Sequence, residues 1–325
     1  MRALVLSALD GPDALHWSEV PDPDPGTRVV IDVRAAGVSY PDLLLTQGRY
    51  QLKAAPPFVP GSEVAGVVVS APPGTPWRPG DRVCAATPFG GYAETATAAP
   101  DRVWPLPPEL TFVEGAALPT NYYTAHFALV RRGRIESGET VLVLGPAGGV
   151  GTATIQIARA LGHRVIAVVH RSGADEFLRG IGADDVVRLG EGWAATVREL
   201  TGGRGVDLVV DPVGGDAFDD AIRVLAPEGR LVVLGFAGGN IPTVKVNRLL
   251  LRNVSVVGAG WGELVRTDPS ALAVVSDAVA DLVRAGLRPP PPVEFPLAEG
   301  AGALRALAAG EILGKAVLVT PRRQT

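Results

Sequence analysis

The sequence contains little cysteine and histidine, which limits the metal sites it could form. Cys84 is the single cysteine among 325 residues, so the chain can form no internal disulfide and no cysteine-rich zinc site. The four histidines (His16, His126, His163 and His170) lack the short spacing typical of paired metal ligands. These shortages argue against a metalloenzyme, and no bound metal is predicted.

Other absences limit the partners and the location of the protein. No apolar run reaches the ~20 residues that span a bilayer. Asp10 follows the N-terminal apolar segment too early for a signal peptide. The net charge of −4 provides no basic excess for binding nucleic acid. We therefore expect a cytoplasmic protein without a membrane or nucleic-acid partner.

The pattern of the remaining residues predicts two domains of different architecture. Residues 1–120 contain short β-branched runs separated by proline- and glycine-rich turns, which indicates a compact barrel or partly open β fold. Strands and helices alternate from residue 121, beginning with a strand at 140–145, a helix at 149–162 and a strand at 164–169. Alternation of this kind, with continuously apolar strands, predicts a parallel sheet covered on both faces.

The segment GPAGGVG, residues 145–151, has the pattern of a dinucleotide-binding turn. It connects a predicted strand to a predicted helix, which is the context that gives a glycine pattern its meaning. Glycines allow a diphosphate to approach the backbone, and the N-terminus of a helix offers unpaired N–H groups. The residues expected to bind the diphosphate are Gly148, Gly149, Val150 and Gly151.

The residues after the next strand indicate which dinucleotide is bound. NAD sites usually have an acid there, which binds the ribose 2′-hydroxyl. Here His170 is followed by Arg171 and Ser172, and no carboxylate occurs before Asp175. A guanidinium and a hydroxyl suit a 2′-phosphate, and a charge-assisted contact is worth about 1.5–3 kcal/mol. The sequence therefore predicts NADPH as the cofactor, bound by Arg171 and Ser172.

Two later glycine turns are expected to border the same cofactor. DPVGG at 211–215 and LGFAGG at 234–239 each follow a predicted strand. Ligands of open parallel sheets lie beyond the carboxyl ends of the strands, so Val213 and Gly235 are predicted at the cofactor. Phe236 would either lie against the nicotinamide or pack within its own turn.

Several motifs, in this order, resemble the medium-chain dehydrogenase/reductase family: AAGVSYPDLLLTQGRY (35–50), PFVPGSEVAGVV (57–68), GDRVCA (80–85), LGPAGGVG (144–151) and GKAVLV (314–319). The resemblance implies an α/β protein with a GroES-like β-rich catalytic domain, residues 1–122 and 263–325. It implies a Rossmann NADP(H)-binding domain with a doubly wound parallel sheet, residues 123–262. It also implies a homodimer through the Rossmann edge strand near residues 253–259.

The resemblance further narrows to the zinc-free quinone oxidoreductase branch, which includes the zeta-crystallin-like proteins. The positions that hold zinc in related alcohol dehydrogenases carry Ser39, Ser62 and Thr120 here. Hydroxyls are poor zinc ligands compared with thiolate or imidazole. Members of this branch reduce quinones, enones or related activated alkenes with NADPH.

By the same resemblance, four residues have candidate roles near the substrate or the cofactor. Ser39 or Tyr50 would donate a hydrogen bond to a carbonyl or enolate oxygen, although Tyr50 would also serve as a simple pocket wall. Thr124 would contact the nicotinamide end or pack within its helix. Lys315 would approach the cofactor or remain a surface lysine.

The chain departs from many quinone oxidoreductases at the predicted phosphate site. Many members have a lysine near the position of Ala174 and a tyrosine at the position of Leu189. Without them, Arg171 carries more of the NADPH preference.

The metal-free chemistry favours acceptors that are already electrophilic, because an ordinary alcohol needs a Lewis acid to release its hydroxyl proton. The main prediction is therefore a zinc-independent NADPH-dependent reductase of quinones or enones. One alternative is an enoyl-thioester reductase, although the three lysines provide no basic strip for phosphopantetheine. Another is a non-catalytic NADPH-binding protein, because a fold alone does not establish turnover.

Overall fold

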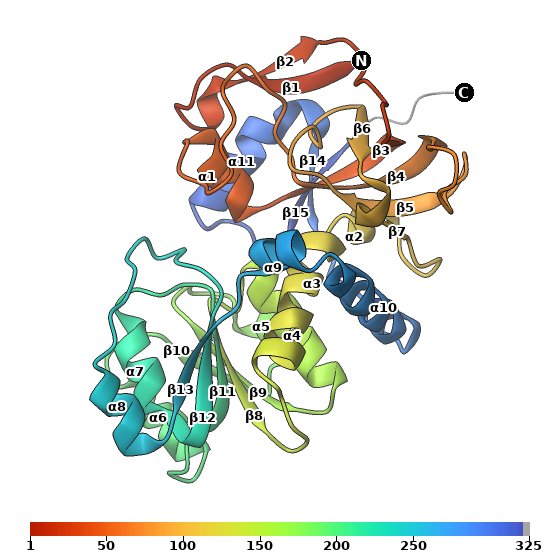
Figure 1. Ribbon diagram of the computed structural model, residues 1–325. Helices are drawn as coiled ribbons and strands as arrows, with labels where there is room; N and C mark the ends of the chain where they lie inside the picture. Colours follow the sequence, from red (N-terminus) through yellow and green to blue (C-terminus); the bar gives the residue numbers. More distant parts are fainter. Residues whose placement is uncertain (321–325) are drawn as a thin grey trace. The chain divides into compact units, whose positions relative to one another are not determined.

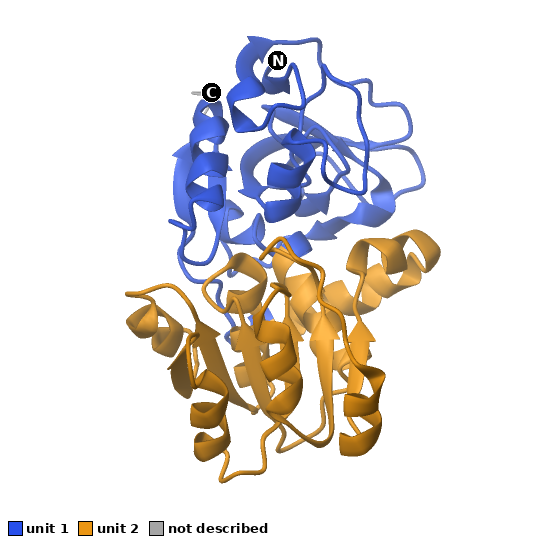
Figure 2. Ribbon diagram, turned by 90° about the vertical axis from the view of Figure 1, so that its left-hand side faces the viewer, with its two compact units in different colours: residues 1–120, 283–325 blue, residues 121–282 orange. Residues whose placement is uncertain are grey.

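A computed structural model, described here for residues 1–320, consists of two compact units (Figures 1 and 2). The first unit contains residues 1–120 and the chain from Val283 onward, and the second contains residues 121–282. The first boundary lies close to the predicted one. The second boundary differs from the predicted 262/263, because α9 (Trp261–Thr267) and most of α10 (Ser270–Arg284) cluster with the second unit.

The first unit is built around a mostly antiparallel sheet with the strand order β14-β15-β3-β4-β5-β7, to which β6 adds beside β3. These strands are β3 (Val29–Val38), β4 (Glu63–Ser70), β5 (Arg82–Ala86), β6 (Thr95–Ala98), β7 (Val103–Pro105), β14 (Val293–Pro296) and β15 (Ala316–Val319). A separate hairpin joins β1 (Arg2–Leu6) to β2 (Leu15–Glu19). Because β15 pairs antiparallel with β3, the C-terminal segment completes a sheet made from the N-terminal part of the chain.

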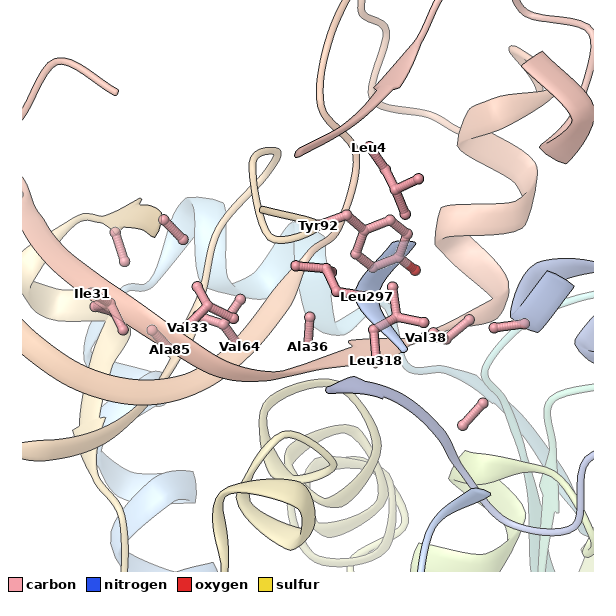
Figure 3. Packing of buried hydrophobic residues seen from close by; sticks show 14 of the residues in the cluster. Leu4, Ile31, Val33, Ala36, Val38, Val64, Ala85, Tyr92, Leu297 and Leu318 are labelled. Carbon is pink, nitrogen blue, oxygen red and sulfur yellow. The ribbon is translucent and has the colours of Figure 1, made fainter. Parts of the chain in front are cut away.

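The core of this unit follows from the alternation of apolar residues along its strands. Ile31 and Val33 on β3 point to the same buried face because side chains two apart share one side of a strand. Figure 3 shows the Tyr92 ring among aliphatic side chains that include Leu4 and Leu297, and its exposed fraction is 0%. The short helices of the unit are α1 (Tyr40–Thr46), α2 (Phe112–Gly115) and α11 (Gly300–Ala308), with single 3-10 turns η1 (Pro12–Ala14), η2 (Pro100–Arg102) and η5 (Leu297–Glu299).

The second unit is a six-stranded parallel sheet with the order β10-β9-β8-β11-β12-β13, which confirms the predicted Rossmann-like architecture. Its strands are β8 (Thr140–Leu144), β9 (Arg164–Val169), β10 (Asp185–Arg188), β11 (Val206–Asp211), β12 (Leu225–Val233) and β13 (Ser255–Gly258). The order reverses between β8 and β11, and ligands of such sheets lie beyond the carboxyl ends of the strands at this reversal.

Helices cover both faces of this sheet, and Figure 1 shows α6 and α7 on one side of the strands and α4 on the other. The helices are α3 (Tyr123–His126), α4 (Gly149–Ala160), α5 (Asp175–Gly180), α6 (Trp193–Leu200), α7 (Ala217–Arg223) and α8 (Val246–Arg252), with π-helical segments η3 (Leu118–Tyr122) and η4 (Phe127–Arg132). Trp193 of α6 and Phe218 of α7 pack with Leu142 and Ile166 of the central strands. Within residues 1–320, no helix combines the length and the apolar character that crossing a bilayer requires.

Candidate functional site

The turn between β8 and α4 is so tight that larger residues would not fit. Gly145 adopts a positive φ of 57°. A Cβ on Gly151 would lie 2.2 Å from the carbonyl oxygen of Gly145, and a Cβ on Gly149 would lie 2.3 Å from the side-chain nitrogen of Asn121. These close approaches leave room for glycine alone at positions 149 and 151, and the backbone N–H groups of the first turn of α4 have no partner within the helix. This geometry suits the diphosphate predicted at residues 148–151, and its binding stays a prediction.

The loop that follows β9 places the predicted phosphate ligands at the carboxyl edge of the sheet. His170 and Ser172 are exposed, and Arg171 is half-buried. Sequence reasoning did not single out Arg188, the last residue of β10, although it stands directly before Leu189. Its guanidinium donates to the carbonyl oxygen of Arg171 and, at 2.7 Å, to the carboxylate of Asp175. A second cation therefore lies against the predicted phosphate loop.

The turn after β11 is held by a buried carboxylate. The Oδ1 atom of Asp211 accepts hydrogen bonds from the backbone N–H groups of Val213 and Gly214, both at 2.8 Å. Burial raises the pKa of Asp211, although these two hydrogen bonds act in the opposite direction. Sequence reasoning missed this residue because an acid that ends a strand has no signature of its own. Its two hydrogen bonds fix the backbone of Val213, which was predicted to border the cofactor.

The remaining predicted cofactor residues of this unit occupy different environments. Phe236 is 40% exposed and lies against the turn after β11, since a Cβ on Gly214 would approach its ring to 3.0 Å. Both expected placements of Phe236, against the nicotinamide or within its own turn, stay predictions. Gly235 is half-buried at the end of the same sheet, and Thr124 is half-buried on α3.

In the first unit, Ser39, Glu63 and Lys315 form a buried polar cluster. The Lys315 ammonium donates to the hydroxyl of Ser39 at 2.9 Å and to the Oε1 atom of Glu63, and Ser39 lies 2.7 Å from that same oxygen. The backbone N–H of Thr120 donates to Oε2 of Glu63 at 2.9 Å. Lys315 is 6% exposed and Glu63 is 0% exposed, so the alternative of a surface lysine is wrong. The cause is the burial of Glu63, which requires a nearby positive charge.

The chemistry of this cluster fixes the direction of its hydrogen bonds. An ammonium can only donate and an ionised carboxylate can only accept, whereas a hydroxyl has a single proton to give. The hydroxyl of Ser39 therefore accepts a hydrogen bond from Lys315 and donates one to Glu63. With its proton engaged, Ser39 would have to break this bond before donating to a substrate.

Asp42 lies buried in the same region, on the first turn of α1. Its exposed fraction is 1%, and its carboxylate accepts a hydrogen bond from the backbone N–H of Ser39 at 2.9 Å. Burial, followed by the negative charge of Glu63, raises the pKa of Asp42 to about 6, while the positive charge of Lys315 opposes this shift. No local pattern of residues predicts a second buried carboxylate at this place.

Two tyrosines respond to the charge of Asp42. Tyr50, the predicted donor, is half-buried, and burial together with Asp42 raises its pKa. Burial and Asp42 also raise the pKa of Tyr92. The hydroxyl of Tyr92 has no partner in good hydrogen-bond geometry among residues 1–320. Because the pKa of Tyr50 is raised, its phenol remains protonated at neutral pH and can donate a hydrogen bond.

Two protein families match this chain. The family described as "Alcohol dehydrogenase GroES-like domain" matches residues 25–108, and the family described as "Zinc-binding dehydrogenase" matches residues 149–277. The first match lies in the sheet-rich first unit and the second in the parallel-sheet unit. Both agree with the two-domain architecture expected from the motifs.

The residues of this chain do not fit the zinc ion that the second description implies. Ser39, Ser62 and Thr120 offer neutral hydroxyls, and the Lys315 ammonium already neutralises the Glu63 carboxylate beside them. In the part of the chain that the structure describes, no three His, Cys, Asp or Glu side chains gather as a metal site would require.

Relatives and solved structures cover most or all of the chain. The rat quinone oxidoreductase-like protein 2 is 39% identical over 82% of this chain and 77% of its own length. A probable oxidoreductase from Mycobacterium abscessus is 53% identical, with a TM-score of 0.91 over 98% of both chains. The quinone oxidoreductase of Thermus thermophilus, solved also with NADPH, is 34% identical, with a TM-score of 0.84 over 98% of this chain and 100% of its own. The chain thus belongs to the medium-chain dehydrogenase/reductase family, as a quinone oxidoreductase-like member.

Proposed function

We propose that this protein is an NADPH-dependent oxidoreductase that transfers hydride to quinones or to activated alkenes such as enones. The observation that carries the proposal is the end of β9, where Arg171 and Ser172 stand in place of the acid of an NAD site. The solved relative that binds NADPH supports the same cofactor. When bound, NADPH supplies the hydride.

Each group of residues in the second unit would hold one part of the cofactor. The glycine turn at 148–151 would hold the diphosphate, because the first N–H groups of α4 have no partner within the helix and Gly148 has no side chain to keep a phosphate away. Arg171 and Ser172 would bind the 2′-phosphate. The residues proposed for the nicotinamide end are Thr124, Val213, Gly235 and Phe236, of which Val213 is held in place by Asp211.

The polar cluster of the first unit favours an acceptor that is already electrophilic. Ser39, Glu63 and Lys315 are hydrogen-bonded to one another, so none of them is free to ligate a Lewis-acidic metal that would activate an alcohol. A quinone needs only a hydride, a hydrogen bond to its carbonyl oxygen and one proton to become a hydroquinone. Positioning of the reactants can supply much of the rate in such a reaction.

Tyr50 is the proposed hydrogen-bond donor to the acceptor oxygen. Its raised pKa keeps the phenol protonated, and a donor near a developing negative charge stabilises the transition state. The proton on the product oxygen then comes from this phenol or from water, and Tyr50 is reprotonated from solvent. Ser39 has a positioning role, since it hydrogen-bonds both members of the directly paired Lys315 and Glu63.

A homodimer through the edge strand β13 is proposed as well. This strand pairs with β12 on one side, and Val256 and Val257 on it are half-buried. The preceding helix α8 exposes Leu250 and Leu251, which are 75% and 78% exposed. A second copy of the strand would pair its free backbone groups and cover apolar surface nearby.

The test is oxidation of NADPH and, in parallel, of NADH by the purified protein in the presence of EDTA. Simple quinones, small enones and a crotonyl-thioester serve as acceptors. We expect turnover of quinones or enones with NADPH preferred, and Arg171→Gln to reduce that preference about 10- to 150-fold. Arg179→Gln, at an exposed position on α5, is the matched control. Turnover of the thioester alone, or tight NADPH binding without turnover, would refute the proposed reaction.

A further inference from the structure

Arg188 brings a second positive charge to the edge of the sheet where the 2′-phosphate is proposed to bind. It is the last residue of β10 and lies opposite Val169, the last residue of the parallel neighbour β9. Because the two strands end together, the side chain of Arg188 can reach the loop that follows β9.

The contacts of Arg188 bridge the two ends of this loop. One terminal nitrogen donates to the carbonyl oxygen of Arg171, and the other pairs with the carboxylate of Asp175 at 2.7 Å. The side chains of Arg188 and Asp175 are 47% and 41% exposed, so both are open to solvent and to a ligand. A guanidinium has five N–H donors, and these two contacts use two of them.

The neighbouring side chains explain why Arg188 provides the charge here. Ala174 is completely buried, and Leu189 packs against the apolar core of the unit. Neither of these side chains therefore presents a charge to the loop. The positive charge of the loop comes instead from Arg171 and Arg188.

We propose that Arg188 is a further residue that determines the preference for NADPH over NADH. Its guanidinium neutralises Asp175, the first carboxylate after β9, which would otherwise repel a 2′-phosphate. The positive charge of Arg171 in the same loop is then left uncancelled by that carboxylate. This inference rests on the proposed function, in which the loop at 170–172 receives that phosphate.

The experiment measures the dissociation constants of NADPH and NADH by titration, with no acceptor present. Arg188→Gln should weaken NADPH binding about tenfold and change NADH binding less than about twofold. Asp175→Asn should restore part of the lost NADPH affinity when added to Arg188→Gln, because it removes the uncompensated carboxylate. Arg179→Gln controls for the loss of an exposed arginine nearby, and NADH binding reports whether the site is still folded.

The outcomes separate a phosphate ligand from a simple loop support. A selective loss of NADPH affinity that Asp175→Asn partly rescues supports the inference. An equal loss for both cofactors would mean that Arg188 only supports the loop, and an unchanged preference would mean that it has no role; either result overturns the inference alone. A wild-type protein that binds NADH as tightly as NADPH would overturn the proposed cofactor and this inference with it.

Discussion

The buried carboxylate of Asp42 provides a sharp test of the electrostatics of the first unit. Asp42 lies 1% exposed near Glu63, and the neighbouring Lys315 balances only one of the two negative charges. The substitution Asp42→Asn removes the charge and keeps an oxygen that can accept the hydrogen bond from the Ser39 N–H. We therefore expect this variant to differ from the wild type mainly in how its stability depends on pH.

The sign and the size of the effect follow from the raised pKa. A pKa that moves from 3.8 to about 6 on folding corresponds to about 3 kcal/mol of free energy. Between these values the folded protein binds more protons than the unfolded chain, so wild-type stability falls as the pH rises through 6. Asp42→Asn has no such titration. Part of this change is already complete at pH 4, so the stability of the variant relative to the wild type should increase by about 2.4 kcal/mol from pH 4 to pH 8.

The measurement is urea unfolding at several pH values between 4 and 8, followed by tryptophan fluorescence. Comparing the two proteins at each pH cancels the titration of all other groups. Asp101→Asn, which changes an exposed carboxylate of the same unit, should show no such trend. If the free energies of unfolding of Asp42→Asn and wild type differed by the same amount at every pH, the reasoning would be refuted. If the stability of the variant relative to the wild type instead decreased as the pH rises, Lys315 would stabilise the Asp42 carboxylate more than burial destabilises it.

Three further predictions concern the other features of the structure. Lys315→Met should lower the free energy of unfolding by about 3–5 kcal/mol, because Glu63 loses its counter-charge; adding Glu63→Gln should recover much of that loss in the same urea experiment. Gly151→Ala should weaken NADPH binding at least about tenfold in a fluorescence titration, since the Cβ of the alanine would lie 2.2 Å from a backbone oxygen. The control Gly180→Ala has no neighbour within 4 Å of the added Cβ and should bind NADPH as the wild type does. Val257→Lys on the edge strand should yield a monomer by light scattering, and a dimer that persists would exclude β13 as the interface.

The parallel sheet and its glycine turn could be predicted because their signals are local. The strand at 140–145 and the helix at 149–162 correspond to β8 and α4, each displaced by at most two residues at either end. A diphosphate turn needs small residues between a strand and a helix, and this requirement is written in adjacent positions. Helix α8 was missed, because none of its residues is buried and its sequence carries no amphipathic period.

The polar cluster of the first unit could not be predicted, because its members are distant in sequence. Lys315 follows Ser39 by 276 positions and Glu63 by 252, and the pairing of β15 with β3 and of β3 with β4 brings them together. A lysine in a sequence is expected at the surface unless a buried acid holds it. Nothing in the residues next to Lys315 reveals that acid.

The sequence by itself determined the fold class, the position of the dinucleotide turn and the positive residues after β9. These depend on periodicity and on short spacings, which the chain carries in adjacent residues. Only the tertiary structure decided how those residues are used. It paired Arg188 with the loop at Arg171 and engaged the proton of Ser39 with Glu63, because hydrogen bonds and buried charges depend on distance in space rather than along the chain.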